Sequence, residues 1–508
     1  MGTTTVLLLR LFRQKPSVKG RPKKICPSER LSYSKHPFIP VYIFIILLLL
    51  CPAALYPQEA NESGGAVFRS SDSALTKGFA WAKKQAFAYV RRSGDKVGPW
   101  YEAALPKRDA FCMRDVAHQL LGADVLGLAD INKNLLGKFA ASVSEARDWC
   151  GYWEIDKDDR PAPVDYKNDR DFWYNLPASF DILNACYRQY LWSGDTAYLR
   201  DPVFLNYYKR TVDDYVRRWD RNGDGLMEGS PDSTSSRGLG SYDEEKTGRI
   251  GSDLVAGEFL GYSNYAAILS LLHRDSAARE YRAKAASLAE LFNGGWWDSA
   301  GRCYHHYLRY DGSWLRDDQM QVFLLRWGIV PKDRIQPVLR SLAVDGIGVE
   351  VFSYIPEELY RYGDPRDAEH ALKRLVSADL KRREYPEVSY AAIGTYARGL
   401  MGIEADAPTS TIRTLSGLTE NGAWAELDGI PVFENRIRIR HDGTTGSTLE
   451  NISGKDITWE ACFYSATPTL KVNGTIRKGQ IGTDAIGRSV VSYRERVTSG
   501  KQCEIRTN

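Results

Sequence analysis

A stretch between residues 152 and 177 combines flat aromatic rings with carboxylates and amides. It contains Trp153, Trp173, Tyr174 and Asn175, together with several acidic residues. Aromatic rings can stack on the apolar face of a sugar ring, while carboxylates and amides bind its hydroxyl groups. A buried core would not hold so many acids unless each had a partner. We therefore expect these four residues to line a wet, concave surface that binds a carbohydrate.

Two Arg-Asp pairs precede a predicted helix and could bind neighbouring hydroxyl groups of a sugar. Arg108-Asp109 and Arg114-Asp115 lie six residues apart in the sequence. Guanidinium groups donate hydrogen bonds and carboxylates accept them, so each pair can clamp a hydroxyl. The alternative is a structural role, in helix capping or in ion pairs.

An acid-rich segment lies near the middle of the chain. It begins with Asp220, Asn222 and Asp224, which resemble the opening of a calcium-binding loop. The twelfth position of such a loop needs a bidentate carboxylate, but Pro231 stands there. We therefore expect a catalytic acid within 228–245 rather than a calcium site. Solvated surface acids are the alternative.

Glu387 lies at the predicted start of a late helix. Pro386, which precedes it, suits the first turn of a helix because that position needs no backbone donor. The positive end of the helix dipole favours an ionised carboxylate, and a general base must be ionised. Glu387 is therefore a candidate base, and a plain first-turn acid that stabilises the helix is the alternative.

No motif for a metal, a nucleotide or a nucleophile competes with this carboxylate chemistry. The sequence lacks H-E-x-x-H, a P-loop, G-x-S-x-G and a dinucleotide-binding fingerprint. Carboxylates among aromatic rings are instead typical of glycoside hydrolysis, in which one acid protonates the leaving oxygen and a second group activates water or attacks. We expect no metal and no cofactor.

The candidate residues lie in loops between predicted helices. Apolar residues recur at helical spacing in 73–92, 111–128, 131–145, 177–193, 203–219, 252–273, 276–293, 318–328, 333–343, 366–378 and 387–401. This pattern predicts a mainly α fold over 72–403, an (α/α)6 toroid of six helical hairpins. Alternating short segments predict a small C-terminal antiparallel β-sandwich over 419–508, with 404–418 as a linker.

Residues 1–58 predict a targeting segment. They hold nine Lys and Arg side chains, one acid, and an apolar run from residue 41 to residue 50. This order is typical of a signal peptide, and the alternative is a membrane tether through 37–55. We expect a secreted or periplasmic protein, or one anchored to the membrane and facing outward. The rest of the chain is mildly acidic, and no basic stripe argues for a nucleic-acid partner.

Six cysteines lie beyond this segment, and none forms a C-x-x-C pair, so zinc and redox sites are disfavoured. Cys462 and Cys503 could form one disulfide in the β-rich region. The other cysteines are expected to be buried free thiols.

Over residues 72–403 the chain resembles the six-hairpin glycosidases, the (α/α)6 superfamily of glucoamylases, trehalases, α-L-rhamnosidases and bile-acid-type β-glucosidases. The resemblance rests on the helix count and on the Arg-Asp pairs that open an early helix. It rests also on Asp224-Gly225-Leu226 followed by Tyr242-Asp243, which is similar to the D-G-L-I-E…Y-D segment of the β-glucosidase branch. That branch has a Trp soon after its Tyr-Asp, where this chain has Glu244-Glu245-Lys246.

The resemblance implies a glycosidase that removes sugar from the non-reducing end of an oligo- or polysaccharide. One of the two Arg-Asp pairs would hold the terminal sugar, with Glu228 also binding substrate. The acid would be Asp243 or Glu244, and the base would be Glu387. Most of the superfamily inverts the anomeric centre, which needs carboxyl groups about 6.5–9.5 Å apart.

Two other functions fit the same helical ring. Polysaccharide lyases and unsaturated-uronyl hydrolases need basic residues for a uronate, and Arg108, Arg114 and His118 could serve them. The wealth of acids argues against that interpretation. A non-catalytic glycan-binding protein would use the same aromatic surface without cutting its ligand.

Overall fold

The computed structural model describes residues 65–103, 105–229, 237–241, 248–316, 318–342 and 344–507. All of these residues belong to one compact unit, Glu59–Asn508. The predicted leader, 1–58, lies outside the described residues. Among the residues that the structure does describe, no helix is long and apolar enough to cross a membrane.

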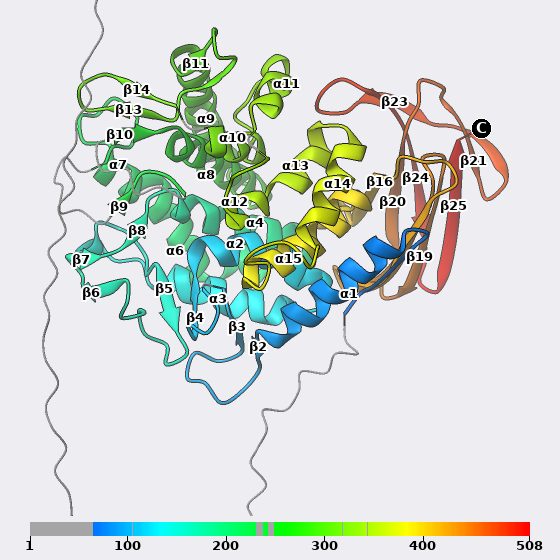
Figure 1. Ribbon diagram of the computed structural model, residues 1–508, viewed down its shortest axis with the longest axis horizontal. Coiled ribbons are helices and arrows are strands. Elements are labelled where there is room, and N and C mark those ends of the chain that lie inside the picture. The colour runs from blue at the N-terminus through cyan, green and yellow to red at the C-terminus, as the bar shows by residue number, and fades with distance from the viewer. Residues whose placement is uncertain are drawn as a thin grey trace, which may run out of the picture. The chain divides into compact units, whose positions relative to one another are not determined.

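A ring of inner helices forms the centre of the helical region (Figure 1). Its members are α2 (Met113–Val125), α4 (Ala178–Ser193), α8 (Ser252–Leu271), α10 (Gln321–Trp327), α12 (Val349–Phe352) with α13 (Ile355–Tyr362), and α15 (Pro386–Gly394) with its continuation η4 (Thr395–Leu400). Each packs on the next, and α15 closes the ring on α2. Every residue of α15 is buried, as expected for a helix that has neighbours on all sides.

Outer helices pair with the inner ones to complete the hairpins. They are α1 (Ser73–Ala88), α3 (Ala129–Ala141), α6 (Pro202–Arg210) with η2 (Thr211–Tyr215) and α7 (Val216–Trp219), α9 (Asp275–Gly295), α11 (Lys332–Ser341) and α14 (Pro365–Leu375). These helices are amphipathic. In α9, for example, the buried residues Tyr281, Ala285 and Leu288 recur at spacings of four and three, so one face packs and the other meets water.

Two sheets form the C-terminal β-sandwich. The first has the order β1 (Val67–Ser70), β17 (Trp424–Val432), β18 (Asn435–Asp442), β19 (Gly446–Ser453), β25 (Lys501–Thr507), β21 (Thr469–Val472) and β22 (Thr475–Lys478). The second has the order β15 (Glu404–Asp406), β16 (Thr411–Leu415), β20 (Ile457–Tyr464), β24 (Ser489–Val497) and β23 (Gln480–Thr483). All neighbours are antiparallel except β16 and β20. The mainly α fold with a β-sandwich that we predicted is confirmed.

The β-sandwich begins earlier in the chain than its sequence pattern indicates. The segment 404–418, expected to be a linker, contains β15 and β16, and β16 pairs in register with β20. Ile412 and Trp459 are partners in this register and are both fully buried, so apolar burial holds the segment in the sheet. Cys462 and Cys503 are free thiols, so the disulfide considered from the sequence is absent.

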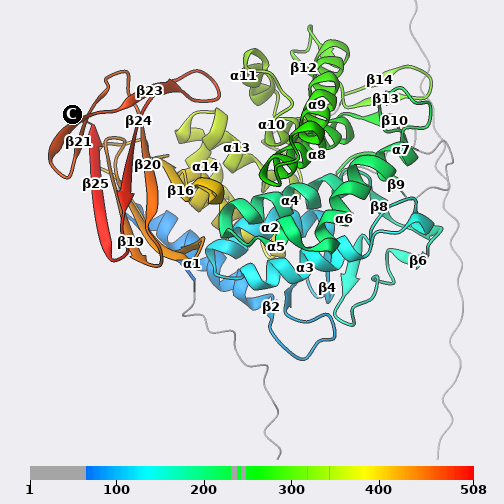
Figure 2. The same ribbon diagram turned by 180° about the vertical axis from the view of Figure 1, so that it is seen from behind.

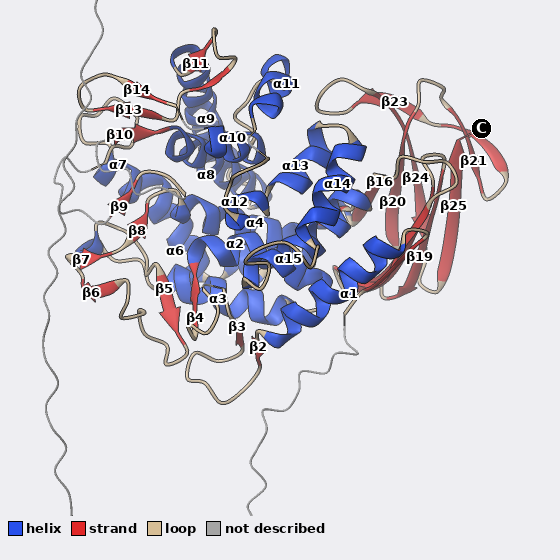
Figure 3. Ribbon diagram, in the orientation of Figure 1, coloured by secondary structure: helices blue, strands red, loops and turns tan. Residues whose placement is uncertain are grey.

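Short strands order the long loops of the ring. They pair as β4 (Ala110–Cys112) with β5 (Glu154–Asp156), β6 (Tyr166–Asn168) with β7 (Asp171–Phe172), β8 (Tyr174–Asn175) with β9 (Arg237–Gly238), and β10 (Gly248–Gly251) with β13 (Tyr307–Arg309) and β14 (Trp314–Leu315). Figure 2 and Figure 3 show that these short strands and the two large sheets lie on opposite sides of the helical region. These loops lead into the N-terminal ends of the inner helices.

Candidate functional site

The N-terminal ends of four inner helices meet through Ser241. The Arg114 guanidinium of α2 donates to the Ser241 carbonyl at 2.7 Å, and Asn175, just before α4, donates to the same oxygen at 2.7 Å. The Ser241 amide donates to Asp253 of α8 at 2.6 Å. Asp115, beside Arg114, contacts Glu387 of α15. Helices that are remote in the sequence therefore bring carboxyl groups to one place.

Glu387 and Asp115 form a buried carboxyl pair. Their exposed fractions are 3% and 6%, and the two carboxyl groups lie within hydrogen-bonding contact of each other. Burial raises the pKa of Glu387 well above its usual value, and the charge of Asp115 raises it further, whereas Arg114 opposes the shift. Oε2 of Glu387 is buried without a hydrogen-bond partner among the described residues.

This ionisation differs from the expectation drawn from the helix N-terminus alone. A helix dipole favours the ionised carboxylate by about 0.3–1 kcal/mol at exposed sites. Burial and the hydrogen bond from a second carboxyl act in the opposite direction and outweigh it, so the pKa of Glu387 rises.

Arg114 connects this pair to the rest of the site. Its Nε donates to Asp115 at 3.3 Å, and its guanidinium lies 5.6 Å from the centre of the Trp153 ring. The Ser241 contact places the same guanidinium at the start of 242–247. The expected catalytic residues Asp243 and Glu244 belong to that segment, which lies outside the described residues.

Arg108 and Asp109 point to different surroundings. Arg108 bonds with the carboxylates of Glu154 at 3.1 Å and Asp165 at 3.2 Å, whereas the exposed Asp109 pairs with Lys157 at 2.5 Å. Burial and the neighbouring charge of Asp165 raise the pKa of Glu154 to about 8. The Asp109 backbone is left-handed, with φ of 53°. The structure brings Arg114 and Asp115 together, but it does not bring Arg108 and Asp109 together as a clamp.

The aromatic residues of the stretch between 152 and 177 differ in how deeply they are buried. Trp153 is buried beneath Arg114, and Trp173 is half-buried. Tyr174 is fully buried, and its hydroxyl shares a hydrogen bond of 2.7 Å with Ser179. Tyr174 therefore packs beneath the site, and its neighbour Asn175 reaches Ser241.

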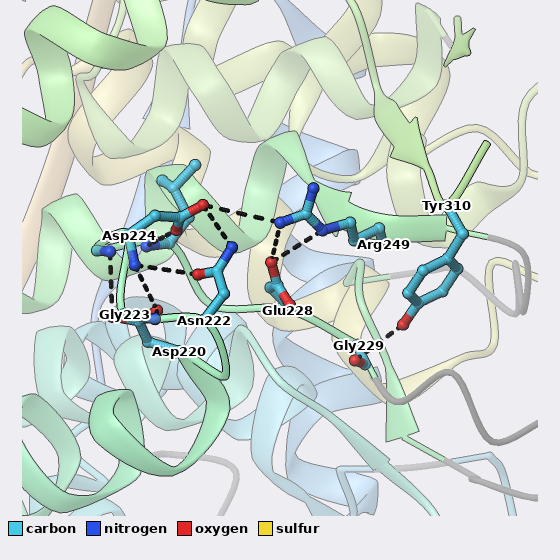
Figure 4. Close-up of polar contacts among 10 residues, drawn as sticks. Asp220, Asn222, Gly223, Asp224, Glu228, Gly229, Arg249 and Tyr310 are labelled. Carbon is cyan, nitrogen blue, oxygen red and sulfur yellow. Dashed lines mark hydrogen bonds and ion pairs between the residues drawn. The ribbon is translucent and has the colours of Figure 1, made fainter. Parts of the chain in front are cut away.

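Glu228 lies beside Arg249 and close to the loop 220–224, as Figure 4 shows. Its carboxylate accepts a hydrogen bond of 2.8 Å from Nε of Arg249, in β10. The nearby Asp220 carboxylate accepts backbone N–H groups of its own loop, including Gly223 at 2.9 Å and Gly225 at 3.0 Å. Within the described ranges, no three His, Cys, Asp or Glu side chains gather as a metal site.

Two participants in this network escaped sequence analysis. Asp253 is fully buried in the first turn of α8, and Ser241 is 2% exposed. An acid in the first turn of a largely apolar helix was the available signal for Asp253. Nothing in the local sequence indicates that the backbone of Ser241 would accept from both Arg114 and Asn175.

Comparison with solved structures places this arrangement in a known fold. The structure is similar to an α-L-rhamnosidase from Dictyoglumus thermophilum, at TM-score 0.58 and 15% identity, over 87% of this chain and 50% of that one. It is also similar to a GH78 family rhamnosidase of Bacillus sp. GL1 (TM-score 0.54, 16% identity, 76% and 40% covered) and to a rhamnosidase from Klebsiella oxytoca with rhamnose bound (0.50, 14%, 66% and 66%).

These likenesses establish the fold. The chain spans half the length of the Dictyoglumus enzyme and less of the Bacillus one. No family model matches the sequence, and no curated protein matches it. The resemblance to the six-hairpin glycosidase superfamily that the sequence indicated is confirmed at the level of the fold.

Proposed function

We propose that this protein is a glycoside hydrolase that removes sugar from the non-reducing end of an oligo- or polysaccharide. One observation carries the proposal: the buried pair of Glu387 and Asp115 is linked through Arg114 to Ser241. Ser241 stands two residues before Asp243 in the sequence. Carboxyl groups from the two halves of the ring are thus available to one substrate, as glycoside hydrolysis requires.

In this proposal Arg114 and Asp115 bind hydroxyl groups of the terminal sugar. A sugar hydroxyl that donates to Asp115 replaces the hydrogen bond with Glu387. Glu387 can then release its proton, and its ionised carboxylate activates the water that attacks the anomeric carbon. Its Oε2 has no hydrogen-bond partner among the described residues and is the atom we assign to that water.

Protonation of the leaving oxygen is assigned to Asp243 or Glu244. An acid and a base separated by a sugar and a water give inversion of the anomeric configuration, at a carboxyl separation of about 6.5–9.5 Å. Glu228 and its partner Arg249 supply further polar groups for the substrate.

The charges of the site favour a neutral sugar over a uronate. Arg108 is held by Glu154 and Asp165, and Arg114 is held by Asp115 and the Ser241 carbonyl. A uronate would have to displace these acceptors to bind either cation. This arrangement disfavours a lyase or an unsaturated-uronyl hydrolase.

Aryl glycosides test the proposal. Because the similar solved structures include rhamnosidases, the panel should contain aryl α-L-rhamnoside beside α- and β-D-glucosides, galactosides, xylosides and mannosides. We expect release of the aryl group from at least one of them, with proton NMR showing the inverted anomer first. Turnover of none of them, together with an unsaturated product from a uronate polymer, would contradict the proposal. Retention would refute only the inverting mechanism.

A further inference from the structure

A polar cavity lies at the other ends of the inner helices. Its volume is about 650 Å³, within the range of about 300–1,000 Å³ typical of small-molecule sites. Its wall comes from α2, α4, α13 and η4 on the ring side, and from β15, β16 and the segment after β23 on the sandwich side. Figure 1 shows β23 on the side of the sandwich that faces α13.

This cavity is separate from the carboxyl pair. Asp124, near the end of α2, lines it, whereas Asp115 and Glu387 do not. Asp124 follows Asp115 by nine residues, which is about 14 Å along a helix. The lining also includes His118, Glu404 and Thr483.

Four arginines and two glutamates of the cavity lining form a connected group of charged side chains. The arginines are Arg188, Arg326, Arg361 and Arg398, and the glutamates are Glu357 and Glu358. Arg326 lies 3.4 Å from each glutamate, Arg398 lies 2.6 Å from Glu357, and Arg361 lies 3.8 Å from Glu358. Elsewhere in the lining, Arg413 pairs with Glu404, and Asp484 pairs with Arg488, which is not itself a lining residue.

Arg188 is the cation left over from this pairing. Among the described residues, no acceptor hydrogen-bonds its guanidinium and no carboxylate lies within 4.0 Å of it. Burial and the nearby Arg326 and Arg361 lower its pKa to about 10, against the opposing pull of Glu357. Its other acidic neighbour, Asp124, instead accepts from the amides of Gln189 at 2.5 Å and Asn132 at 2.8 Å.

The neighbouring carboxyl does not cancel the surplus charge. Burial raises the pKa of Asp124 to about 7, and burial also raises the pKa of Glu358. Near neutral pH, therefore, Asp124 carries only part of a negative charge. Arg188 is half-buried at the cavity wall, so an anion that entered the cavity would gain a charge-assisted hydrogen bond there.

We propose that this cavity binds a small polar molecule through one carboxylate or phosphate group, held by Arg188 with Arg326 and Arg361. Planar guanidinium groups match the oxygens of both kinds of anion. The volume admits a molecule about the size of one sugar acid or sugar phosphate. The site would act independently of the proposed hydrolase activity, because no residue of the carboxyl pair lines it.

Calorimetric titration of the purified protein tests this site without any measurement of activity. The probes are inorganic phosphate and D-glucuronate, with D-glucose as the neutral match for glucuronate. We expect saturable binding of one or both anions and none of glucose. Phosphate alone would identify the phosphate class, and glucuronate alone would identify the carboxylate class.

Arg188→Met removes the unpaired cation at nearly constant length. Because charge-assisted hydrogen bonds are lost, we expect anion affinity to fall about tenfold to a hundredfold. Arg200→Met, at an exposed arginine of α5 (Ala197–Arg200), is the matched control and should keep the affinity. Thermal unfolding without ligand checks the fold, and Arg188→Met should not lower the midpoint. Absence of binding to the native protein, or equal binding to Arg188→Met, would show an internal ion network only and overturn the proposal.

Discussion

The two ends of the inner helix ring differ in the ionisable side chains that the helix termini contribute. Their N-terminal ends present carboxyl groups, with Asp115 of α2, Asp253 of α8 and Glu387 of α15. Their C-terminal ends present guanidinium groups, among them Arg326 in the last turn of α10 and Arg361 in the last turn of α13. Helix dipoles favour both placements, because the N-terminal end of a helix is positive and the C-terminal end is negative.

The comparison shows where the dipole explains the charges and where it does not. It explains arginines in last turns, but Arg188 lies well inside α4, five residues before the helix ends. It also favours an ionised Glu387, yet burial and Asp115 raise the pKa of that residue. At each end of the ring, one group therefore departs from what the helix dipole favours: Glu387 at the N-terminal ends and Arg188 at the C-terminal ends. Such groups are the candidates for function.

Glu387→Gln should have the largest effect on the carboxyl end of the ring. Loss of a general base lowers kcat by about 10²–10⁴-fold, so we expect kcat/KM on the best aryl glycoside to fall at least about 10²-fold. Glu384→Gln is the matched control, because Glu384 is exposed three residues earlier in the chain. Equal activities for the two variants would remove Glu387 from the mechanism.

Gly122→Ala should disturb the crossing of α2 and α15 that holds Asp115 against Glu387. An added Cβ would lie 2.1 Å from the Tyr390 carbonyl oxygen, so the two helix backbones must separate. We expect the free energy of unfolding to fall by about 1–3 kcal/mol, and kcat/KM to fall with it. Gly137→Ala on α3, where nothing lies within 4 Å, serves as the control and should leave both unchanged. Urea denaturation would show whether the crossing tolerates the methyl group.

Glu387→Gln should also change stability in a pH-dependent way, with a smaller effect. The pKa of Glu387 in the folded protein is raised above the ordinary value of 4.5, so the folded state holds its proton more tightly than the unfolded state does. Below pH 4.5 both states are protonated, and the variant should match the native protein. As the pH rises from there toward the folded-state pKa, the native protein loses stability that the neutral glutamine does not lose.

Thermal midpoints measured from pH 4 to pH 8 check this sign. The midpoint of Glu387→Gln should exceed that of the native protein by a margin that grows with pH. A margin that shrinks as the pH rises would mean that Glu387 is ionised and stabilised in the folded protein.

More of the fold than of the candidate site could be predicted from the sequence. Helical periodicity identified the buried and amphipathic helices because their burial patterns are local, as in α9 and α15. Residues 404–418 were predicted to be a linker, whereas they belong to the sheet. The contact that holds them there, Ile412 with Trp459, is parallel and joins segments that are distant in the sequence. Local spacing carries little information on such a contact.

The site illustrates the same limit at the level of single residues. Asp115 and Glu387 were each identified from their positions at helix starts, but their contact depends on how α2 packs against α15. The direction of the pKa shift of Glu387 follows from that contact and could not be predicted from the helix start alone. Likewise, the arginines of the cavity come from α4, α10, α13 and η4, so no short motif connects them.

The pH dependence of kcat/KM in Asp115→Asn, measured beside the native protein, tests the central claim most directly. That claim is that burial and the neighbouring Asp115 carboxyl together raise the pKa of Glu387 in the free protein. Asparagine keeps the shape but removes the neighbouring charge, so the pKa of Glu387 should fall and the acidic limb of the profile should move to lower pH. An acidic limb that stays in place in Asp115→Asn would contradict the coupling of Glu387 to Asp115.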